Sequence, residues 1–387
     1  MDLFNGTLAS TSTFAGSNRS VIGEALEDRL VSSNDADDVG CIEKYDYYEP
    51  TEKWLLGIVA LPFIVVGLLA NAMSVRIFSH RHMRQQSVNW YLLILAISDS
   101  VILLGAFFVL TLPRLGEILS WWEATAVSYY STPYMYSFMT MAQTISVWMT
   151  AAMSLHRFIG VCLPYKASSI LQTNKIKMLI VGVILSAVVF NTTRFFEVHI
   201  VQVCQMVPIN VQLPVLRPTE LRMNELYRKI FYEWAYTLIM FAIPFTILII
   251  VNSMVIKAIH KSRRIHAKLN MYDDGARKQE LAKEISTSIM LVAIVVAFLT
   301  CNTLAFVVNI MEKLELDDLY VLFVPWSNML VMTNASINIC IYCMFSDKYR
   351  QLMFFYLNIC GQNARSKSNG ENNYQVTLST FEWSRQM

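Results

Sequence analysis

Residues 133–165 read PYMYSFMTMAQTISVWMTAAMSLHRFIGVCLPY, and this stretch decides the class of the protein. No Asp, Glu, Lys or Arg occurs from Ala124 to Leu155. A helix that crosses a bilayer needs about 20 mostly apolar residues, and this run is long enough. It ends at His156 and Arg157, where a long basic side chain can reach the aqueous edge of the membrane. The stretch therefore predicts a transmembrane helix with an arginine at one end.

Apolar runs of similar length recur along the whole chain. The 387 residues are 55% hydrophobic and 16% charged, which is too apolar for an ordinary soluble domain. The runs lie at 54–79, 89–112, 133–156, 176–196, 231–256, 286–310 and 320–345. Together they predict an all-α membrane protein, a seven-transmembrane-helix bundle that occupies residues 54–345.

The lysines and arginines of the loops predict the orientation of this bundle. They gather in the loops after the first, third and fifth runs, most densely in 257–283. Because basic loops stay inside, we expect these loops to be cytoplasmic, the N-terminus outside the plasma membrane and the tail 361–387 inside. Residues 1–15 lack the basic start and apolar core of a secretory signal peptide. We expect the first run to act as the signal anchor.

Residues 1–53 are polar and rich in Ser, Asn and Asp. We expect them to form an extracellular disordered tail with N-linked glycans at the sequons of Asn5 and Asn18. The tail contains eleven acidic and four basic residues. This excess of negative charge would steer a cationic ligand toward the helix bundle, or it only keeps the tail solvated.

The cysteines divide by compartment. Five of the seven lie in the apolar runs or face the reducing cytoplasm: Cys162, Cys301, Cys340, Cys343 and Cys360. Cys41 and Cys204 are the two that we expect outside, where disulfides persist. A disulfide between them is the prediction, and two free thiols or an intermolecular bridge are the alternatives. No cluster of His or acidic residues at membrane depth suggests a metal site.

Asp99 is the one acidic residue in the middle of a predicted span. A buried carboxylate needs polar partners or a cation. The candidate partners are Asn71, Ser146, Asn334 and Asn338, from the first, third and seventh runs. Two interpretations stay open, a hydrogen-bonded structural acid and a polar core that binds a sodium ion. No other cofactor is expected.

Arg157 follows Ser146 by 11 residues, close to three helical turns, so the two share one face of the third span. In the simpler interpretation Arg157 extends to the aqueous edge of the membrane. In the functional one it pairs with an acid on another helix at rest and is released on activation. Glu284, at the cytoplasmic start of the sixth run, is the candidate acid.

The alternative class is a transporter or channel. No internal repeat is visible, as a duplicated transporter would have, and of the acidic residues Asp99 alone lies deep in the membrane. No phosphate-binding loop, GxSxG or HExxH motif appears, so we expect no enzyme. A net charge of +2 gives no reason to expect a nucleic-acid partner.

Five short motifs resemble those of the rhodopsin-like G-protein-coupled receptors, across residues 54–356. They are GLLANAMSV with Asn71, LAISD with Asp99, HRFIGVCLPY with Arg157, AIPF with Pro244, and NICIY with Asn338 and Tyr342. His156 replaces the usual Asp beside the arginine. The sixth run lacks the usual Trp and Pro, which leaves its register uncertain. Thr132 occupies the place of the cysteine that the family ties to its second extracellular loop.

The resemblance implies a receptor that couples to heterotrimeric G proteins, with arrestin as a further partner. The activation switch that it implies comprises His156, Arg157, Tyr165, Glu284, Asn338 and Tyr342. The segment FSDKYRQLMFFYL looks like the family's eighth helix. We expect a short amphipathic helix at 346–360 on the membrane lipid, with palmitoylation of Cys360.

Several segments resemble invertebrate FMRFamide-type neuropeptide receptors, among them FNTTRFFEV and LRMNELYRKIFYEWAY. Met139 stands where amine receptors carry an Asp, and Met332 where opsins carry the retinal Lys. The resemblance implies a neuronal receptor for an amidated peptide, with another small-peptide receptor as the runner-up. An outer acid would hold the ligand's arginine, either Glu197 or Glu233, with Glu123 and Glu225 as more peripheral candidates. The full predicted ligand set is Met139, Gln143, Arg194, Glu197, Glu233, Trp234, Trp326 and Asn328.

Overall fold

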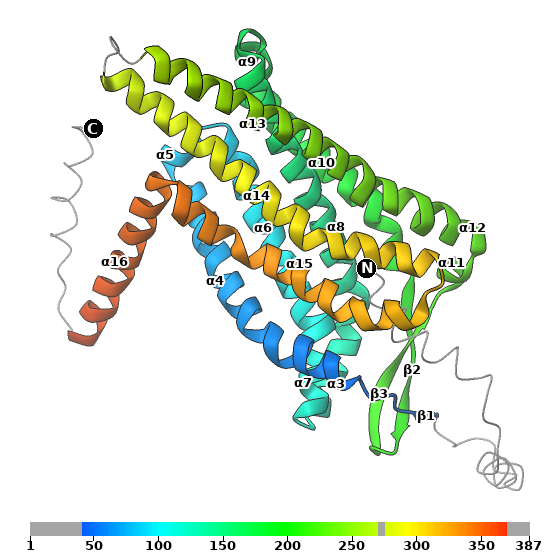
Figure 1. Cartoon of the computed structure of the whole chain (residues 1–387). Coiled ribbons are helices and arrows are strands. Elements are labelled where there is room, and N and C mark those ends of the chain that lie inside the picture. Colours follow the sequence, from blue (N-terminus) through cyan, green and yellow to red (C-terminus); the bar gives the residue numbers. More distant parts are fainter. Residues whose placement is uncertain (1–40, 270–274, 370–387) are drawn as a thin grey trace, which may run out of the picture.

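The computed structural model describes residues 41–269 and 275–369 and, within 262–284 and 359–369, the backbone alone. Among the described residues, seven helical segments are long and apolar enough to cross a membrane, as the sequence predicts. They form one bundle, with short helices and a small sheet at its ends (Figure 1). The predicted seven-transmembrane-helix bundle is confirmed.

The spans run over Pro50–Phe78, Val88–Ile118, Trp122–Cys162, Thr173–Phe196, Glu225–Lys261, Ile285–Lys313 and Asp317–Phe345. Their helices are α3 (Pro50–Glu52), α4 (Ala60–Phe78), α6 (Val88–Ala106), α7 (Leu112–Ile118), α8 (Trp122–Cys162), α10 (Thr173–Asn191), α12 (Glu225–Tyr227), α13 (Ile243–Leu269), α14 (Gly275–Lys313) and α15 (Asp317–Phe345). π-helical turns join some of them, at Lys53–Val59, Phe107–Thr111, Arg228–Tyr236 and Leu238–Ala242. The connecting helices are α5 (Arg81–Arg84), α9 (Pro164–Ile170) and α11 (Glu220–Met223).

The third span is longer than the run predicted at 133–156. Helix α8 begins at Trp122, and Pro133 lies inside it. The turns before Pro133 are held by the second span, because Ser128 donates a hydrogen bond to the carbonyl oxygen of Phe108 at 2.7 Å. The proline removes only one backbone donor, so the helix continues on both sides of it.

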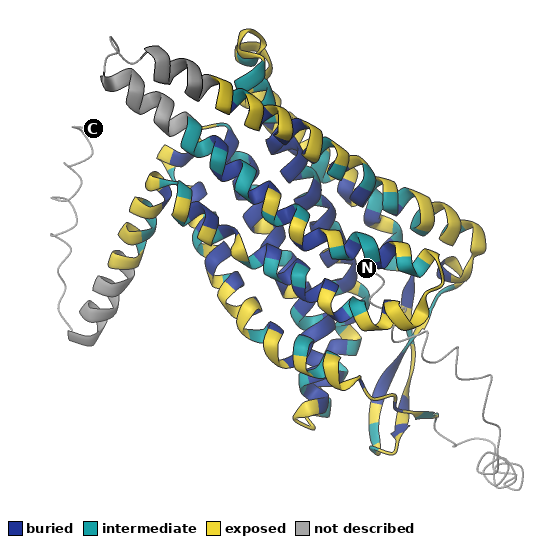
Figure 2. Cartoon of the chain, viewed as in Figure 1, coloured by how far each residue is buried: buried dark blue, intermediate teal, exposed yellow. Residues whose placement is uncertain are grey.

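Helix α8 lies at the centre of the bundle and packs against α6, α10 and α13. Buried residues gather on the inner faces of the helices, while the outward faces carry exposed apolar side chains (Figure 2). In a soluble protein such faces would be unfavourable, but in a bilayer they meet lipid chains. The outward apolar surface therefore agrees with a membrane-spanning bundle.

Glycine allows two close approaches between spans. An added Cβ at Gly67 of α4 would lie 2.7 Å from Leu103 Cδ1 of α6 and 2.9 Å from Ser336 Cβ of α15. At Gly105 of α6 it would lie 2.7 Å from Met139 Cβ of α8. Small residues permit such packing of membrane helices, where the backbones come together directly.

The loop between the fourth and fifth spans forms a β-hairpin, which the all-α prediction omits. Strands β2 (Val198–Val207) and β3 (Val211–Pro218) pair antiparallel, and β1 (Ile42–Lys44) pairs parallel with β2. β2 is rich in valine and isoleucine, which favour extended backbone. Figure 1 shows this sheet beside α3 and α7, at one end of the bundle. We call this the sheet end.

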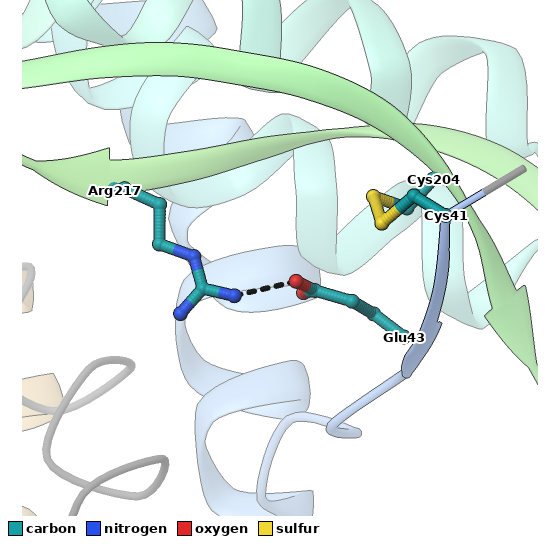
Figure 3. Close-up of a disulfide and its surroundings, with 4 residues drawn as sticks. All are labelled: Cys41, Glu43, Cys204 and Arg217. Atoms are coloured by element: carbon teal, nitrogen blue, oxygen red, sulfur yellow. Dashed lines mark hydrogen bonds and ion pairs between the residues drawn. A yellow bond between two sulfur atoms is a disulfide. The ribbon is translucent and has the colours of Figure 1, made fainter.

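The predicted disulfide between Cys41 and Cys204 is present and ties β1 to β2 (Figure 3). The amide of Gln205 donates to the Cys41 carbonyl oxygen at 2.8 Å. Arg217 of β3 pairs with Glu43 across the sheet. The sheet thus holds the start of the described chain by a covalent bond, a backbone bond and an ion pair.

A second set of contacts, the tail clasp, fixes the residues that follow. Glu117 of α7 is 8% exposed and accepts hydrogen bonds from the Tyr45 hydroxyl and the Tyr48 amide, both at 3.1 Å. Its other oxygen lies 3.0 Å from Lys53 Nζ. Arg114, one turn earlier, pairs with Glu52 at 2.9 Å. The prediction of a disordered tail is therefore wrong for residues 41–53, because disulfide and clasp together fix this segment.

Burial raises the pKa of Tyr45 well above its ordinary value, and the nearby Tyr48 and Glu117 raise it further. Burial likewise raises the pKa of Tyr48. Both hydroxyls therefore stay protonated at physiological pH. The Tyr45 hydroxyl keeps its role as a donor to Glu117.

At the other end of the bundle, α16 (Asp347–Asn369) is the predicted eighth helix and continues beyond the expected end at residue 360. Tyr349 is fully buried and its hydroxyl lies 2.7 Å from Ser74 Oγ of α4. Phe354 and Leu357 are 58% and 49% exposed, which suits a helix lying on a membrane surface. The predicted glycan sites Asn5 and Asn18 lie outside the described residues, as do the side chains of Glu284 and Cys360.

We expect Gly67→Ala to lower the melting temperature of the purified protein. The new methyl group would overlap Leu103 and Ser336, and overpacking of this kind costs about 1–3 kcal/mol. Gly182→Ala is the matched control, because a Cβ there meets nothing within 4 Å. It should leave the melting temperature unchanged or raise it. Equal melting temperatures for the two variants would contradict the close packing of α4 against α6 and α15.

Candidate functional site

The predicted polar core forms where the second, third and seventh spans meet. Asp99 of α6 is fully buried. Ser146 of α8 donates to its Oδ1 at 3.3 Å, and Asn338 of α15 donates to its Oδ2 at 2.8 Å. Each carboxylate oxygen thus accepts a bond from a different helix. The carboxylate ties three spans together at one point.

The other two candidates lie close by in the fold but play different parts. Asn71 of α4 donates from Nδ2 to the backbone oxygen of Ala335 at 2.8 Å, so it binds the seventh span directly and does not bind the carboxylate. Asn334 is buried on α15, about one turn before Asn338. The Asp99 carboxylate and the Ser146 hydroxyl offer oxygen ligands of the kind that a hard cation such as Na⁺ prefers, whereas Asn338 presents its amide nitrogen.

Further along α15, toward α16, Tyr342 lies in an aromatic cluster that joins α15 to α4 and α16. Its ring packs edge-on against Phe78 of α4 at 5.1 Å and lies 5.3 Å from Tyr349 of α16. The Tyr342 hydroxyl is buried and has no hydrogen-bond partner. A buried hydroxyl without a partner costs free energy, which an arrangement that supplies a partner would recover.

His156 and Arg157, near the end of the third span, have different surroundings. The ring of His156 packs edge-on against Tyr91 of α6 at 5.6 Å. Arg157 is partly buried. Tyr165, on α9, is 99% exposed and is not gathered with the rest of the predicted switch. The pairing of Arg157 with Glu284 concerns a side chain outside the described residues.

At the sheet end, Arg194 and Glu197 belong to one buried charge network. Glu197 is fully buried, and its Oε2 lies 3.6 Å from Arg194 Nη1 and 3.2 Å from Arg222 Nη1 of α11. Its Oε1 accepts the Tyr227 hydroxyl at 2.6 Å. The hydroxyl of Tyr232 also bonds Oε2. We call these five residues the Glu197 network.

Aromatic rings from two spans enclose the arginine of this network. The Arg194 guanidinium lies 4.5 Å from the ring centre of Tyr232, 5.2 Å from Phe231 and from Tyr236, and 5.8 Å from Tyr136. It also donates to the Tyr136 hydroxyl at 3.0 Å. Rings hold a desolvated cation through their negative faces. The network therefore joins the third, fourth and fifth spans beneath the hairpin.

This network revises the role of Glu197 as a free acid for a ligand's arginine. Its carboxylate already has two arginines and two tyrosine hydroxyls. The other candidate, Glu233, is exposed, and Lys313 donates to its backbone oxygen. An incoming arginine would have to displace existing partners of Glu197, whereas Glu233 is accessible.

The remaining predicted ligand residues divide between the inside and the outside of the bundle. Met139 and Gln143 of α8 and Asn328 of α15 are each 4% exposed. The Asn328 side-chain amide is a buried donor without a partner. Trp234 and Trp326 are 62% and 48% exposed, so the protein does not enclose them. Met139, Gln143 and Asn328 thus lie inside the bundle, and the two tryptophans lie on its outer surface.

The predicted set leaves out several residues that matter in the structure. Arg222, Tyr227 and Tyr232 complete the Glu197 network, and Arg114 and Glu117 hold the tail clasp. A signal for the first three was present, since all lie in the segment LRMNELYRKIFYEWAY. Arg114 and Glu117 carry opposite charges and lie one turn apart at the end of an apolar run. This pattern is also typical of an exposed helix end, so it does not by itself indicate the tail clasp.

Comparison with known proteins gives relatives among receptors. The FMRFamide receptor of Drosophila melanogaster is 28% identical over 323 residues, which are 80% of this chain and 56% of the fly protein. The chain therefore spans little more than half of that relative. The probable G-protein coupled receptor frpr-1 of Caenorhabditis elegans is 28% identical over 84% of this chain and 85% of its own length. The FMRFamide peptide receptor frpr-18 of the same worm is 29% identical over 78% and 69%.

The family comparison covers most of the bundle. The model described as 7 transmembrane receptor (rhodopsin family) matches residues 70–342, from the first span to the end of the polar core and Tyr342. This region holds Asn71, Asp99, Arg157 and Asn338, the residues on which the resemblance was first based. The chain belongs to the rhodopsin family of seven-transmembrane receptors.

Proposed function

We infer that the protein is a plasma-membrane receptor for an amidated, FMRFamide-like neuropeptide and signals through heterotrimeric G proteins. The rhodopsin family is a family of receptors and not of enzymes. Two of the relatives described above are named FMRFamide receptors, and this observation carries the proposed ligand class. The expected chemistry fits, because the chain before Trp54 carries an excess of acidic residues that attracts a basic peptide.

In this proposal the sheet end faces outward. The N-terminal tail is extracellular with glycans at Asn5 and Asn18, and the basic end of α13 and α14 meets the G protein and arrestin. α16 lies on the inner membrane surface, with palmitoylation at Cys360 as a further anchor. Expression in neurons follows from the proposed ligand.

Signal transfer would be a shift between two arrangements of the bundle. The peptide's amidated end would enter beside Met139, Gln143 and Asn328, where the Asn328 amide is a buried donor without a partner. Movement of α15 would then reach Asn338 and Tyr342 on the same helix. Arg157, at the end of α8, would meet the G protein in the active arrangement.

The polar core would bind Na⁺ in the inactive arrangement. Asp99 supplies a carboxylate, and Ser146 supplies a hydroxyl oxygen within reach of it. A cation there would offset the buried negative charge and hold α6, α8 and α15 together. Agonist binding that moves α15 would remove Asn338 from the site and release the ion.

The first test is a panel of amidated Arg-Phe peptides and their free-acid forms, applied to cells that express the full chain, with calcium and cAMP as readouts. An amidated peptide should activate the receptor, and its free acid should be more than about tenfold weaker, because a carboxylate would be buried.

Arg157→Ala should abolish the signal while labelled-peptide binding and surface expression stay unchanged. Full signalling by Arg157→Ala at matched expression would exclude its role, and silence across the panel would exclude the ligand class.

The second test concerns Asp99→Asn. In NaCl, the wild-type receptor should bind agonist more weakly than in choline chloride of equal ionic strength, because sodium stabilises the inactive arrangement. In Asp99→Asn this difference should disappear, since an amide cannot balance the charge of the ion. A sodium effect of equal size in both proteins would leave Asp99 with a structural role alone.

The third test separates the two outer acids. Glu197→Gln should lower the melting temperature, since breaking a buried ion pair costs about 3–5 kcal/mol. Glu233→Gln should leave it unchanged, because Glu233 is exposed, but should weaken peptide potency more than about tenfold if this acid holds the ligand's arginine. A potency shift below tenfold in Glu233→Gln would show that this acid is not the anchor.

A further inference from the structure

A cavity of about 700 Å³ opens at the sheet end and shares no residue with the Glu197 network. Its walls come from the segment before α3, the start of the first span, the end of α7, the start of α8 and the hairpin turn at Ile209. Figure 1 shows α3, α7 and the hairpin at this same end of the molecule. The proposed peptide function leaves this cavity without a role.

Three aromatic rings, those of Tyr47, Trp54 and Trp122, line the cavity. Tyr47 and Trp54 are 53% and 64% exposed, so no part of the described protein covers them. Trp122 is fixed by Tyr45, whose ring packs edge-on against it at 5.3 Å. Aromatic rings grouped around an open space hold quaternary ammonium ions, which are attracted by the negative ring faces.

The charge of the lining is balanced. Among the described residues that line the cavity, the charged ones are Lys53 and Glu117, and they form an ion pair. The Lys53 side chain is 28% exposed and that of Glu117 is 4% exposed, so the cation is reachable and the carboxylate lies behind it. An ammonium group has three donors, and Glu117 takes one of them. The accessible lining thus offers rings for a cation and an amine for an anion, with a net charge of zero.

The cavity also borders the lipid-facing surface. Ile58 and Ile118 line it, belong to the first and second spans, and are each 38% exposed. Tryptophans and lysines at the end of a span occupy the level of lipid headgroups. A ligand at this place therefore has its polar part in the cavity and its apolar part along the spans.

We propose that this cavity binds the phosphocholine headgroup of a phosphatidylcholine molecule from the adjoining leaflet. The quaternary ammonium lies against the rings of Tyr47, Trp54 and Trp122, and the phosphate accepts hydrogen bonds from Lys53. The acyl chains pass along Ile58 and Ile118. The lipid site is separate from the peptide site and stands whether or not the proposed ligand is correct.

A peptide arginine suits this cavity less well. Among the described lining residues the one carboxylate, that of Glu117, already receives the Tyr45 hydroxyl, the Tyr48 amide and Lys53, so a second cation would meet Lys53 without a free acid. An anionic lipid would find Lys53 but leave the three rings without a cation. A zwitterion uses both features.

The test uses the full-length receptor in phosphatidylglycerol nanodiscs that contain a small fraction of phosphatidylcholine with a photoreactive headgroup. After irradiation, the crosslinked fraction is measured and the labelled peptides are mapped. Labelling should saturate with the phosphatidylcholine fraction and map to the segment around Trp54. Trp54→Ala should reduce it about threefold to tenfold, and Trp54→Phe, which keeps a ring, should retain most of it.

Trp121→Ala is the matched control, since Trp121 is 56% exposed at the same end but does not line the cavity. It should label like the wild type. Labelling that rises linearly with the phosphatidylcholine fraction, and equally in the wild type and all three variants, would overturn the site. Competition by free phosphocholine at the concentration of the lipid would assign the cavity to a soluble ligand. Displacement by an Arg-Phe-amide peptide, with loss of peptide binding in Trp54→Ala, would assign it to the peptide. The labelling and its competition by phosphocholine need neither peptide nor G protein, so their failure leaves the proposed function untouched.

Discussion

The arrangement of the bundle depends on one carboxylate that must be buried inside a membrane protein. Asp99 has no access to water, so its oxygens need donors from neighbouring helices. Ser146 and Asn338 supply them, and this fixes the second, third and seventh spans relative to one another. The same helix that carries Asn338 continues to Tyr342 and its aromatic cluster. A change in the ionic state or partners of Asp99 therefore reaches the end of the bundle that is proposed to meet the G protein.

Buried charges also need partners at the sheet end, and there the partners are other charged side chains. These ion pairs lie in the Glu197 network and in the tail clasp on Glu117. Because the disulfide joins the clasped tail to the hairpin, the residues before the first span and the loop between the fourth and fifth spans form one unit. In the proposed function a ligand that enters the bundle meets this unit first. The disulfide and the contacts of the clasp favour a preformed entrance over a loop that folds on binding.

The polar groups at the sheet end have different roles, depending on whether they belong to the Glu197 network. Glu197 pairs with both Arg194 and Arg222 and offsets part of their positive charge, and these contacts stabilise the junction of three spans. The other polar groups at this end are of another kind: the buried amide donor of Asn328 inside the bundle, and the rings and amine around the peripheral cavity. Two chemically different ligands, an amidated peptide and a zwitterionic lipid, thus have separate places in the proposals.

The sequence by itself determined the seven spans, because in lipid a single apolar run of sufficient length satisfies its backbone hydrogen bonds only as a helix. It also determined that Asp99 needs partners, and it left Cys41 and Cys204 as the candidate pair, whose disulfide the structure then showed. Only the tertiary structure decided which partners are used. Asn71 faces a backbone oxygen and not the carboxylate, Glu197 is occupied by arginines, and residues 41–53 are held by Glu117. These outcomes depend on distances of a few ångströms between side chains on different helices, and the spacing of residues along one helix does not contain that information.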